Sequence, residues 1–203
     1  MKRRSVTTKK RTRLDAHVRR SELVTAAAKL LSQGGIEALE FTAVAAAAGV
    51  TRPVVYKFFP TRAALVEAIL ADFEEELTRR FFAASAGRMM GSLEDATRIF
   101  IDAICETIEA KGPGAWELFG GHAADAEIAA LGRAAQERLM RPWYPRIAET
   151  TRAPKRELAT VTAMLVAAGR AVLARWYAGE LSRAEAARAT ARGVSALLAA
   201  FTR

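Results

Sequence analysis

One short stretch limits the folds open to this chain more than any other feature. The segment Ala48-Gly-Val-Thr-Arg-Pro53 stands between two short helical segments and combines a glycine, a threonine and a proline. Glycine supplies the backbone freedom for a tight turn. Threonine can cap the next helix by accepting an N–H bond, and proline is tolerated in a first helical turn. The stretch therefore predicts a sharp corner between two helices.

The residues after the corner predict a helix with two different faces. Val55 and Phe59 are four residues apart and can face a core, with Val50 as an apolar plug inside the corner. The opposite face then shows a mixed set of side chains: Arg52, Val54, Tyr56 and Lys57. A corner of this kind places its second helix in the major groove of DNA.

The rest of the chain also has helical patterns. No segment alternates apolar and polar residues, and glycines and prolines fall between long helical stretches. We expect an all-α protein of about nine helices. Its first helix would be capped by Asp15 and end near residue 33. A fourth helix after Thr61 would bury a stripe at four-residue spacing: Leu65, Ile69, Phe73, Leu77 and Phe81.

Charge is concentrated at the N-terminus. Residues 1–20 hold nine Lys or Arg against one acid, whereas the other residues hold 22 basic and 21 acidic side chains. A basic arm on a near-neutral body suits a polyanion, most often nucleic acid, although a solvated tail has the same composition. We expect three parts: a disordered basic arm (1–14), a helix-turn-helix domain (15–62) and a larger helical domain (63–203).

Several classes of function are disfavoured. No apolar run reaches the length of a membrane span, and the N-terminus has no apolar signal core. The single cysteine, Cys105, and two distant histidines give no metal-ligand spacing and no catalytic pair. We expect a cytoplasmic protein with no enzyme activity, no cofactor, no metal and no membrane partner.

Residues 41–65 read Phe-Thr-Ala-Val-Ala-Ala-Ala-Ala-Gly-Val-Thr-Arg-Pro-Val-Val-Tyr-Lys-Phe-Phe-Pro-Thr-Arg-Ala-Ala-Leu. This stretch resembles the DNA-binding domain of the TetR family of transcriptional regulators, and the resemblance covers about residues 18–70. It implies a sequence-specific regulator, most often a repressor, released from a palindromic operator by a small molecule. A ligand-independent architectural DNA-binding protein, or a small-molecule-binding protein with a vestigial DNA head, are the alternatives.

The resemblance implies DNA contacts at named positions. Thr51 would cap the recognition helix and touch phosphate, and Arg52 would read guanine. Arg62 would bind phosphate at the start of the fourth helix. The full predicted set is Thr42, Thr51, Arg52, Pro53, Val54, Tyr56, Lys57 and Arg62, with Arg11 and Arg13 of the arm near the minor groove. Three positions depart from the common family pattern: Glu40, Phe58 and Arg62.

The C-terminal part is expected to dimerise and to bind a mainly apolar effector. The last two helices carry apolar faces suited to a four-helix interface between copies, such as Leu158, Val161, Leu165 and Val172, although such faces can also pack within one chain. Large adaptable side chains could line an apolar pocket, as the resemblance implies. They are Trp116, Phe119, His122, Met140, Trp143, Tyr144, Cys105, Phe100 and Met164. Taken singly, each is better explained as part of a core.

Overall fold

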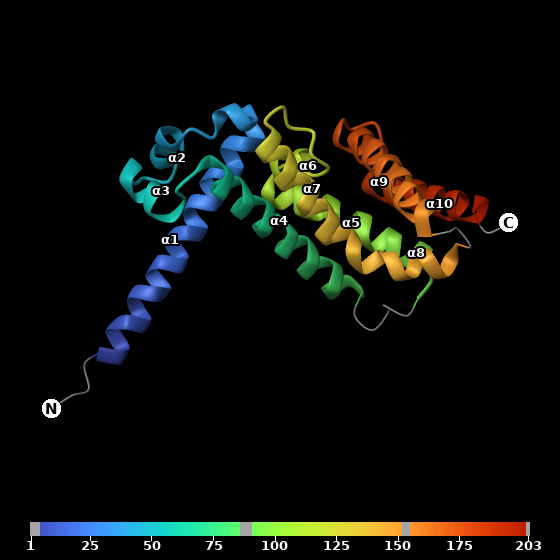
Figure 1. Ribbon diagram of the computed structural model, residues 1–203, viewed down its shortest axis with the longest axis horizontal. Helices are drawn as coiled ribbons and strands as arrows, with labels where there is room; N and C mark the ends of the chain where they lie inside the picture. The colour runs from blue at the N-terminus through green and yellow to red at the C-terminus, as the bar shows by residue number, and fades with distance from the viewer. Residues whose placement is uncertain (1–4, 86–90, 152–154, 202–203) are drawn as a thin grey trace. The chain divides into compact units, whose positions relative to one another are not determined.

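In the computed structural model, the described residues are 5–85, 91–151 and 155–201, with side chains from residue 15 onward and from 156 in the last segment. The expected all-α fold is confirmed, because these residues form helices and turns and contain no strand (Figure 1). The first elements are α1 (Ser5–Gly34), η1 (Ile36–Ala38), α2 (Phe41–Ala47), α3 (Arg52–Phe58) and α4 (Arg62–Ser85). The others are α5 (Leu93–Lys111), α6 (Gly114–Leu118), α7 (Ala126–Met140), η2 (Arg141–Trp143), α8 (Tyr144–Thr150), α9 (Lys155–Tyr177) and α10 (Arg183–Ala200).

The first helix is longer than the sequence predicted. It begins at Ser5, so Asp15 lies inside it and the expectation that Asp15 caps it was wrong. The expected disordered arm is likewise helical from Ser5, and residues 1–4 lie outside the described residues. Residues 5–33 contain no glycine or proline, so nothing in the sequence interrupts the helix before its end.

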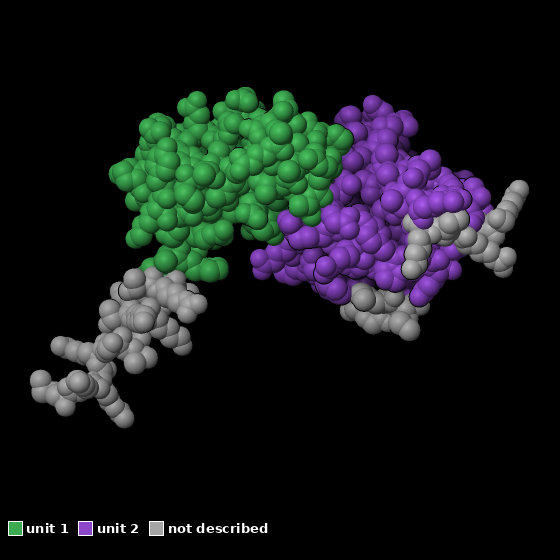
Figure 2. All heavy atoms as spheres, in the orientation of Figure 1, with its two compact units in different colours: residues 1–73, 111–135 green, residues 74–110, 136–203 purple. Residues whose placement is uncertain are grey.

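The chain divides into two compact units, which Figure 2 colours green and purple. Unit 1 consists of residues 1–73 and 111–135, and unit 2 of residues 74–110 and 136–203. The boundaries fall within α4, near the end of α5 and within α7, so they do not follow the boundary at residue 62 that the sequence suggested. The helix-turn-helix and the α6–α7 segment therefore belong to one compact body.

Unit 1 is built on a fully buried core. Leu23, Val44, Val55 and Leu65 come from α1, α2, α3 and α4 respectively, and each is 0% exposed. The α6 segment packs closely on the end of α1. The backbone N–H of Gly114 donates to the hydroxyl of Ser32 at 3.1 Å, and a Cβ at Gly114 would lie 2.7 Å from the Ser32 nitrogen. Only glycine fits at this crossing.

Unit 2 is organised around the pair α9 and α10, with α8 packed on α9. Its buried cluster consists of Ile147, Val161, Leu165 and Leu198. Ser182 and Glu185 form a capping box at the start of α10, in which the Ser182 side chain accepts from the Glu185 N–H at 3.3 Å. Between α7 and α8, Pro142 lies in the 3-10 turn η2 and Pro145 in the first turn of α8.

The faces of α9 differ from the sequence prediction. Val161 and Leu165 were expected to bind a second copy, but they are buried in their own unit. A different face of α9 is exposed. One helix, residues 156–177, is long and apolar enough to cross a membrane by length and composition alone, and only 28% of its most apolar window is buried. The prediction concerned an uninterrupted apolar run, and Arg170 and Arg175 interrupt the run in this helix.

Candidate DNA-binding surface

The corner between α2 and α3 is held by backbone geometry. Gly49 has φ 62°, a left-handed conformation that side chains rarely adopt, while a Cβ there would meet no atom within 4 Å. The N–H of Val50 donates to the Ala45 carbonyl at 2.9 Å and closes the turn. Glycine is therefore needed for conformation and not for space, and Val50 lies half-buried in the corner.

Thr51 precedes α3 at the position that the sequence predicted, but without the predicted side-chain hydrogen bond. It occupies the N-cap position with extended backbone angles, φ −91° and ψ 152°, and Pro53 lies in the first turn. Its side chain accepts no capping hydrogen bond, so that part of the prediction was wrong. The Thr51 carbonyl instead accepts from the Val54 N–H at 2.9 Å. The exposed hydroxyl is consequently not used in the helix cap.

The two faces of α3 separate as predicted. Val55 and Phe59 are 0% and 1% exposed. The guanidinium carbon of Arg20, on α1, lies 5.1 Å from the centre of the Phe59 ring. The other face presents Arg52, Pro53, Tyr56 and Lys57 to solvent, with Val54 half-buried. The helix thus offers two cations and a phenol on one exposed surface.

Arg52 and Tyr56 form a small ordered unit on this surface. The Arg52 guanidinium donates to the Tyr56 hydroxyl at 2.9 Å and lies 5.3 Å from its ring centre. Phe41, at the start of α2, packs edge-on against the same ring at 4.7 Å. The Tyr56 ring is therefore packed against Phe41 while its hydroxyl binds Arg52. Because a phenol can also donate, its O–H remains able to bind a phosphate oxygen.

Arg62, at the first position of α4, lies between two carboxylates. Its guanidinium is 3.7 Å from Asp125, which precedes α7, and 3.9 Å from Glu37 of η1. Thr61 caps α4 by accepting from the Ala64 N–H at 3.1 Å. Neither acid was singled out from the sequence. Asp125 precedes a helix start, which is a capping signal, but nothing in the sequence links it to a residue 63 positions earlier.

The remaining predicted DNA contacts are less defined. Thr42 is exposed in the first turn of α2. Glu40, the N-cap of that helix, makes no side-chain capping bond and is also exposed. Arg11 and Arg13 belong to α1, but their side chains are outside the described part of the chain.

The nine predicted ligand residues are divided between the two units. Trp116, Phe119 and His122 belong to unit 1, and the other six belong to unit 2. Trp116 and Phe119 pack with Phe73 of α4, at ring distances of 6.3 and 5.6 Å. His122 is exposed. In unit 1, the candidates are therefore partly core.

In unit 2, a second aromatic cluster is formed by Phe81, Phe100 and Trp143, with ring distances of 5.0 to 5.7 Å. Met164 is 46% exposed on α9 and lies outside the buried cluster of this unit. Met140 is half-buried. Phe100 and Trp143 are the two predicted ligand residues in this aromatic cluster, and Phe81 was not predicted as a ligand residue.

Two of the predicted ligand residues in unit 2, Cys105 and Tyr144, have raised pKa values and stay protonated at neutral pH. Burial raises the pKa of Cys105 to about 12, so its thiol stays protonated at neutral pH and is a poor nucleophile. Burial, aided by a hydrogen bond to Glu137, raises the pKa of Tyr144 to about 12. Among the described residues there is no group of three His, Cys, Asp or Glu side chains that could hold a metal ion.

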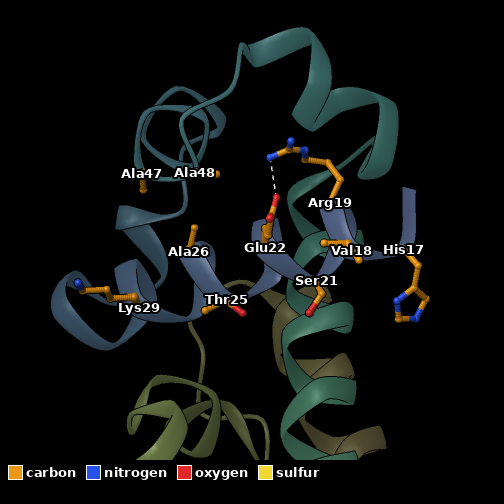
Figure 3. Close-up of a pocket in the computed structure, with 10 residues that line it drawn as sticks. All are labelled: His17, Val18, Arg19, Ser21, Glu22, Thr25, Ala26, Lys29, Ala47 and Ala48. Atoms are coloured by element: carbon orange, nitrogen blue, oxygen red, sulfur yellow. Dashed lines mark hydrogen bonds and ion pairs between the residues drawn. The ribbon is translucent and has the colours of Figure 1, made fainter. Parts of the chain in front are cut away.

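A hollow of about 660 Å³ lies on unit 1 between α1 and the end of α2 (Figure 3). Residues of α1 line it, including His17, Ser21, Thr25 and Lys29, and Ala47 and Ala48 close one side. None of the nine predicted ligand residues and none of the α3 residues lines this hollow. It is an open hollow on the α1 side of the helix-turn-helix, so the predicted effector site stays a prediction.

Comparison with known proteins agrees with this geometry. Residues 23–69 match the family described as bacterial regulatory proteins, tetR family. A putative TetR-family regulator from Rhodococcus sp. is 23% identical over 89% of this chain and 98% of that one, with a TM-score of 0.62. One from Shewanella sp. PV-4 is 15% identical over 91% and 98%, with a TM-score of 0.68. One from Streptomyces coelicolor is 23% identical over 91% and 82%, with a TM-score of 0.65.

No curated protein matches the chain. At these identities the solved structures show a shared fold, whereas the family match places the helix-turn-helix. Fold and surface together define a helix-turn-helix DNA-binding regulator. Residues 23–69 match the tetR family model, and the resemblance seen in residues 41–65 is confirmed.

Proposed function

We propose that this chain is a homodimeric transcriptional repressor that binds a palindromic operator and leaves it when a small apolar effector binds. The observation that carries the proposal is the exposed face of α3. Val55 and Phe59 are buried, and this fixes the orientation of α3. Arg52, Tyr56 and Lys57 are therefore held on the exposed side of a helix. Cations and a phenol in this arrangement suit base edges and phosphates.

The surface divides into two kinds of contact. Arg52 is suited to guanine O6 and N7, a bidentate contact worth about 1–3 kcal/mol of discrimination. In the free protein one of its five N–H donors bonds to the Tyr56 hydroxyl, which holds the guanidinium near the exposed face. Tyr56, Thr42, Thr51, Lys57 and Arg62 would supply phosphate contacts. Those contacts give most of the affinity and its salt dependence.

Dimerisation is supported by the exposed face of α9. A single helix-turn-helix reads too few base pairs to be selective, and two copies solve this by reading half-sites one helical turn or more apart. Met164 is 46% exposed beside a row of exposed alanines on this face. An apolar helix face of this kind is stable in water when a second copy covers it. Together with α10 it would form a four-helix interface.

Effector release needs a modest energy. A hundredfold loss of operator affinity requires the effector to prefer the non-binding conformation by about 2.7 kcal/mol. The cluster of Phe81, Phe100 and Trp143 favours an apolar effector. A regulator of this kind acts where bacterial DNA lies, in the cytoplasm, and has no need of catalytic groups.

The test is selection of random duplex DNA by the full-length protein at about 150 mM salt, followed by sequencing. Enrichment of an inverted repeat supports the repressor proposal and supplies the operator. An Arg52→Ala variant selected in parallel should enrich the same repeat with relaxed preference at one position in each half-site. Binding without enrichment, fading as salt rises, would favour an architectural DNA-binding protein. No binding to any duplex would favour a ligand-binding protein with a vestigial head.

A further inference from the structure

Arg62 is held in a position that the DNA contact alone does not require. Its guanidinium lies 3.7 Å from Asp125 and 3.9 Å from Glu37, and all three residues belong to unit 1. The Arg62 side chain is 40% exposed, so it is also accessible to a phosphate. A guanidinium that binds a phosphate bidentately turns its donors toward that phosphate and away from other oxygens.

Asp125 makes two different interactions with its two oxygens. Oδ1 accepts from the N–H groups of Glu127 at 2.9 Å and Ile128 at 3.1 Å, so Asp125 caps the first turn of α7. Oδ2 faces Arg62. The position of the carboxylate that pairs with Arg62 is therefore set by the start of α7.

We propose that Asp125, assisted by Glu37, competes with operator phosphate for Arg62, so that the segment before α7 sets operator affinity. This inference rests on the proposed DNA-binding function. Paired with the two acids, Arg62 is directed away from DNA, and the acids also place negative charge beside the phosphate site. Each acid thus lowers operator affinity while it keeps its pairing.

The same segment follows candidate effector residues. Trp116 and Phe119 precede it in the chain. Both rings pack on Phe73, which lies on α4, the helix that begins at Arg62. Gly121 has φ 76°, and a Cβ there would lie 2.7 Å from the Ala129 carbonyl oxygen, so the backbone between Phe119 and Asp125 packs closely on α7. A molecule that displaces this backbone changes the distance between Asp125 and Arg62.

The magnitude is small, because the pairs are exposed. Ion pairs of this kind contribute at most about 1 kcal/mol, which corresponds to about a fivefold change in affinity. Asp125 is 42% exposed and nearer, whereas Glu37 is 86% exposed and farther. We therefore expect Asp125→Asn to tighten operator binding about two- to fivefold and Glu37→Gln to tighten it less.

The experiment measures operator Kd at about 150 mM salt for the full-length wild type and variants. Asparagine keeps the capping acceptor and removes the charge, and Asp125→Ser is a second uncharged capping variant if Asp125→Asn folds poorly. Glu127→Gln is the matched control, since Glu127 is exposed, two residues away, and forms no ion pair with Arg62 among the described pairs. It should change Kd less than Asp125→Asn.

A double-mutant cycle decides whether the effect passes through Arg62. In an Arg62→Ala background, Asp125→Asn should no longer tighten binding beyond the Glu127→Gln control. Equal effects of the two substitutions, or a gain that persists without Arg62, would overturn the competition. A wild type that binds no operator would overturn the proposed function as well, whereas normal wild-type binding with unchanged Kd in both Asp125 variants would overturn this inference alone.

Discussion

The helix-turn-helix of unit 1 and the α9–α10 pair of unit 2 both bury one apolar helix face, yet they leave different surfaces exposed. In α3, Val55 is completely buried and the exposed face is polar and cationic. In α9, Val161 and Leu165 are buried, but the exposed face is apolar. It contains Met164 and a row of alanines: Ala163, Ala167, Ala168, Ala171 and Ala174.

The difference between the two exposed faces indicates which kind of partner each region can bind. A cationic surface is stable in water by itself and becomes a binding site only when a polyanion arrives. An apolar surface is unfavourable in water. Covering it with another apolar surface stabilises the complex by about 25 cal/mol for each Å² removed from water. The first region is therefore suited to reversible DNA contact, and the second to a lasting protein interface.

The largest effect is expected from the core of the helix-turn-helix. Phe59→Ala should lower the free energy of unfolding by about 3–5 kcal/mol, because it leaves a cavity where a ring is 1% exposed. Phe82→Ala is the matched control, since that ring is 53% exposed, and should cost less than about 1 kcal/mol. Urea denaturation followed by circular dichroism measures both. Equal losses would mean that α3 is not anchored through Phe59.

The next effect concerns the exposed face of α9. Ala171→Glu should raise the dimer dissociation constant more than about tenfold, since it buries an unpaired charge in the proposed interface. Ala130→Glu places the same charge on an exposed position of α7 and should leave the dimer intact. Sedimentation velocity over a concentration series separates the two. A wild type that is monomeric throughout, or an Ala171→Glu dimer as tight as wild type, would remove the proposed role of this face.

A third prediction concerns Arg52 and Tyr56. Arg52→Ala should cost about 1–3 kcal/mol on the preferred operator and relax one base position. Tyr56→Phe should weaken binding to all sequences by about 0.5–1.5 kcal/mol and also relax that position partly, because Arg52 loses its hydroxyl partner. Lys29→Ala removes a charge away from α3 and should change no base preference. Fluorescence anisotropy with single-base operator variants is the measurement.

The smallest effect is expected from acid. Hydrogen bonds from Arg79, with further help from Arg80, lower the pKa of Glu76 from its usual 4.5 to about 2. A lowered pKa in the folded state means that the stabilisation is present above pH 4.5 and is lost as pH falls toward 2. Urea midpoints should therefore fall less between pH 5 and pH 3 in Glu76→Gln than in wild type. Glu75→Gln, an exposed neighbour, should keep the wild-type dependence.

The recognition corner could be predicted from the sequence because the forces that shape it act over a few residues. Gly49 must adopt a positive φ, Pro53 suits a first helical turn, and the four-residue spacing of Val55 and Phe59 defines the buried face. The hydroxyl of Thr51 failed as a cap although its position was right. Residue type predicts a helix end better than it predicts which hydrogen bond forms there.

The inner face of α9 was harder to assign. Apolar residues surround most of this helix, so periodicity alone does not say which side is buried. The small side chains of Ala167 and Ala171 and the larger ones of Val161 and Leu165 are equally apolar in pattern. Packing against α8 and α10 chose the larger ones, since they fill the space between helices and bury more area.

What the sequence determined by itself was an all-helical chain, a helix-turn-helix at residues 41–59 and the side chains that its second helix exposes. Tertiary structure alone decided that Arg62 lies between Glu37 and Asp125, that α6 crosses α1 at Gly114, and that α9 leaves its alanine face uncovered. The physical reason is range. Turn and helix preferences depend on neighbours within about four residues, whereas these three features depend on how segments up to 82 residues apart pack in space.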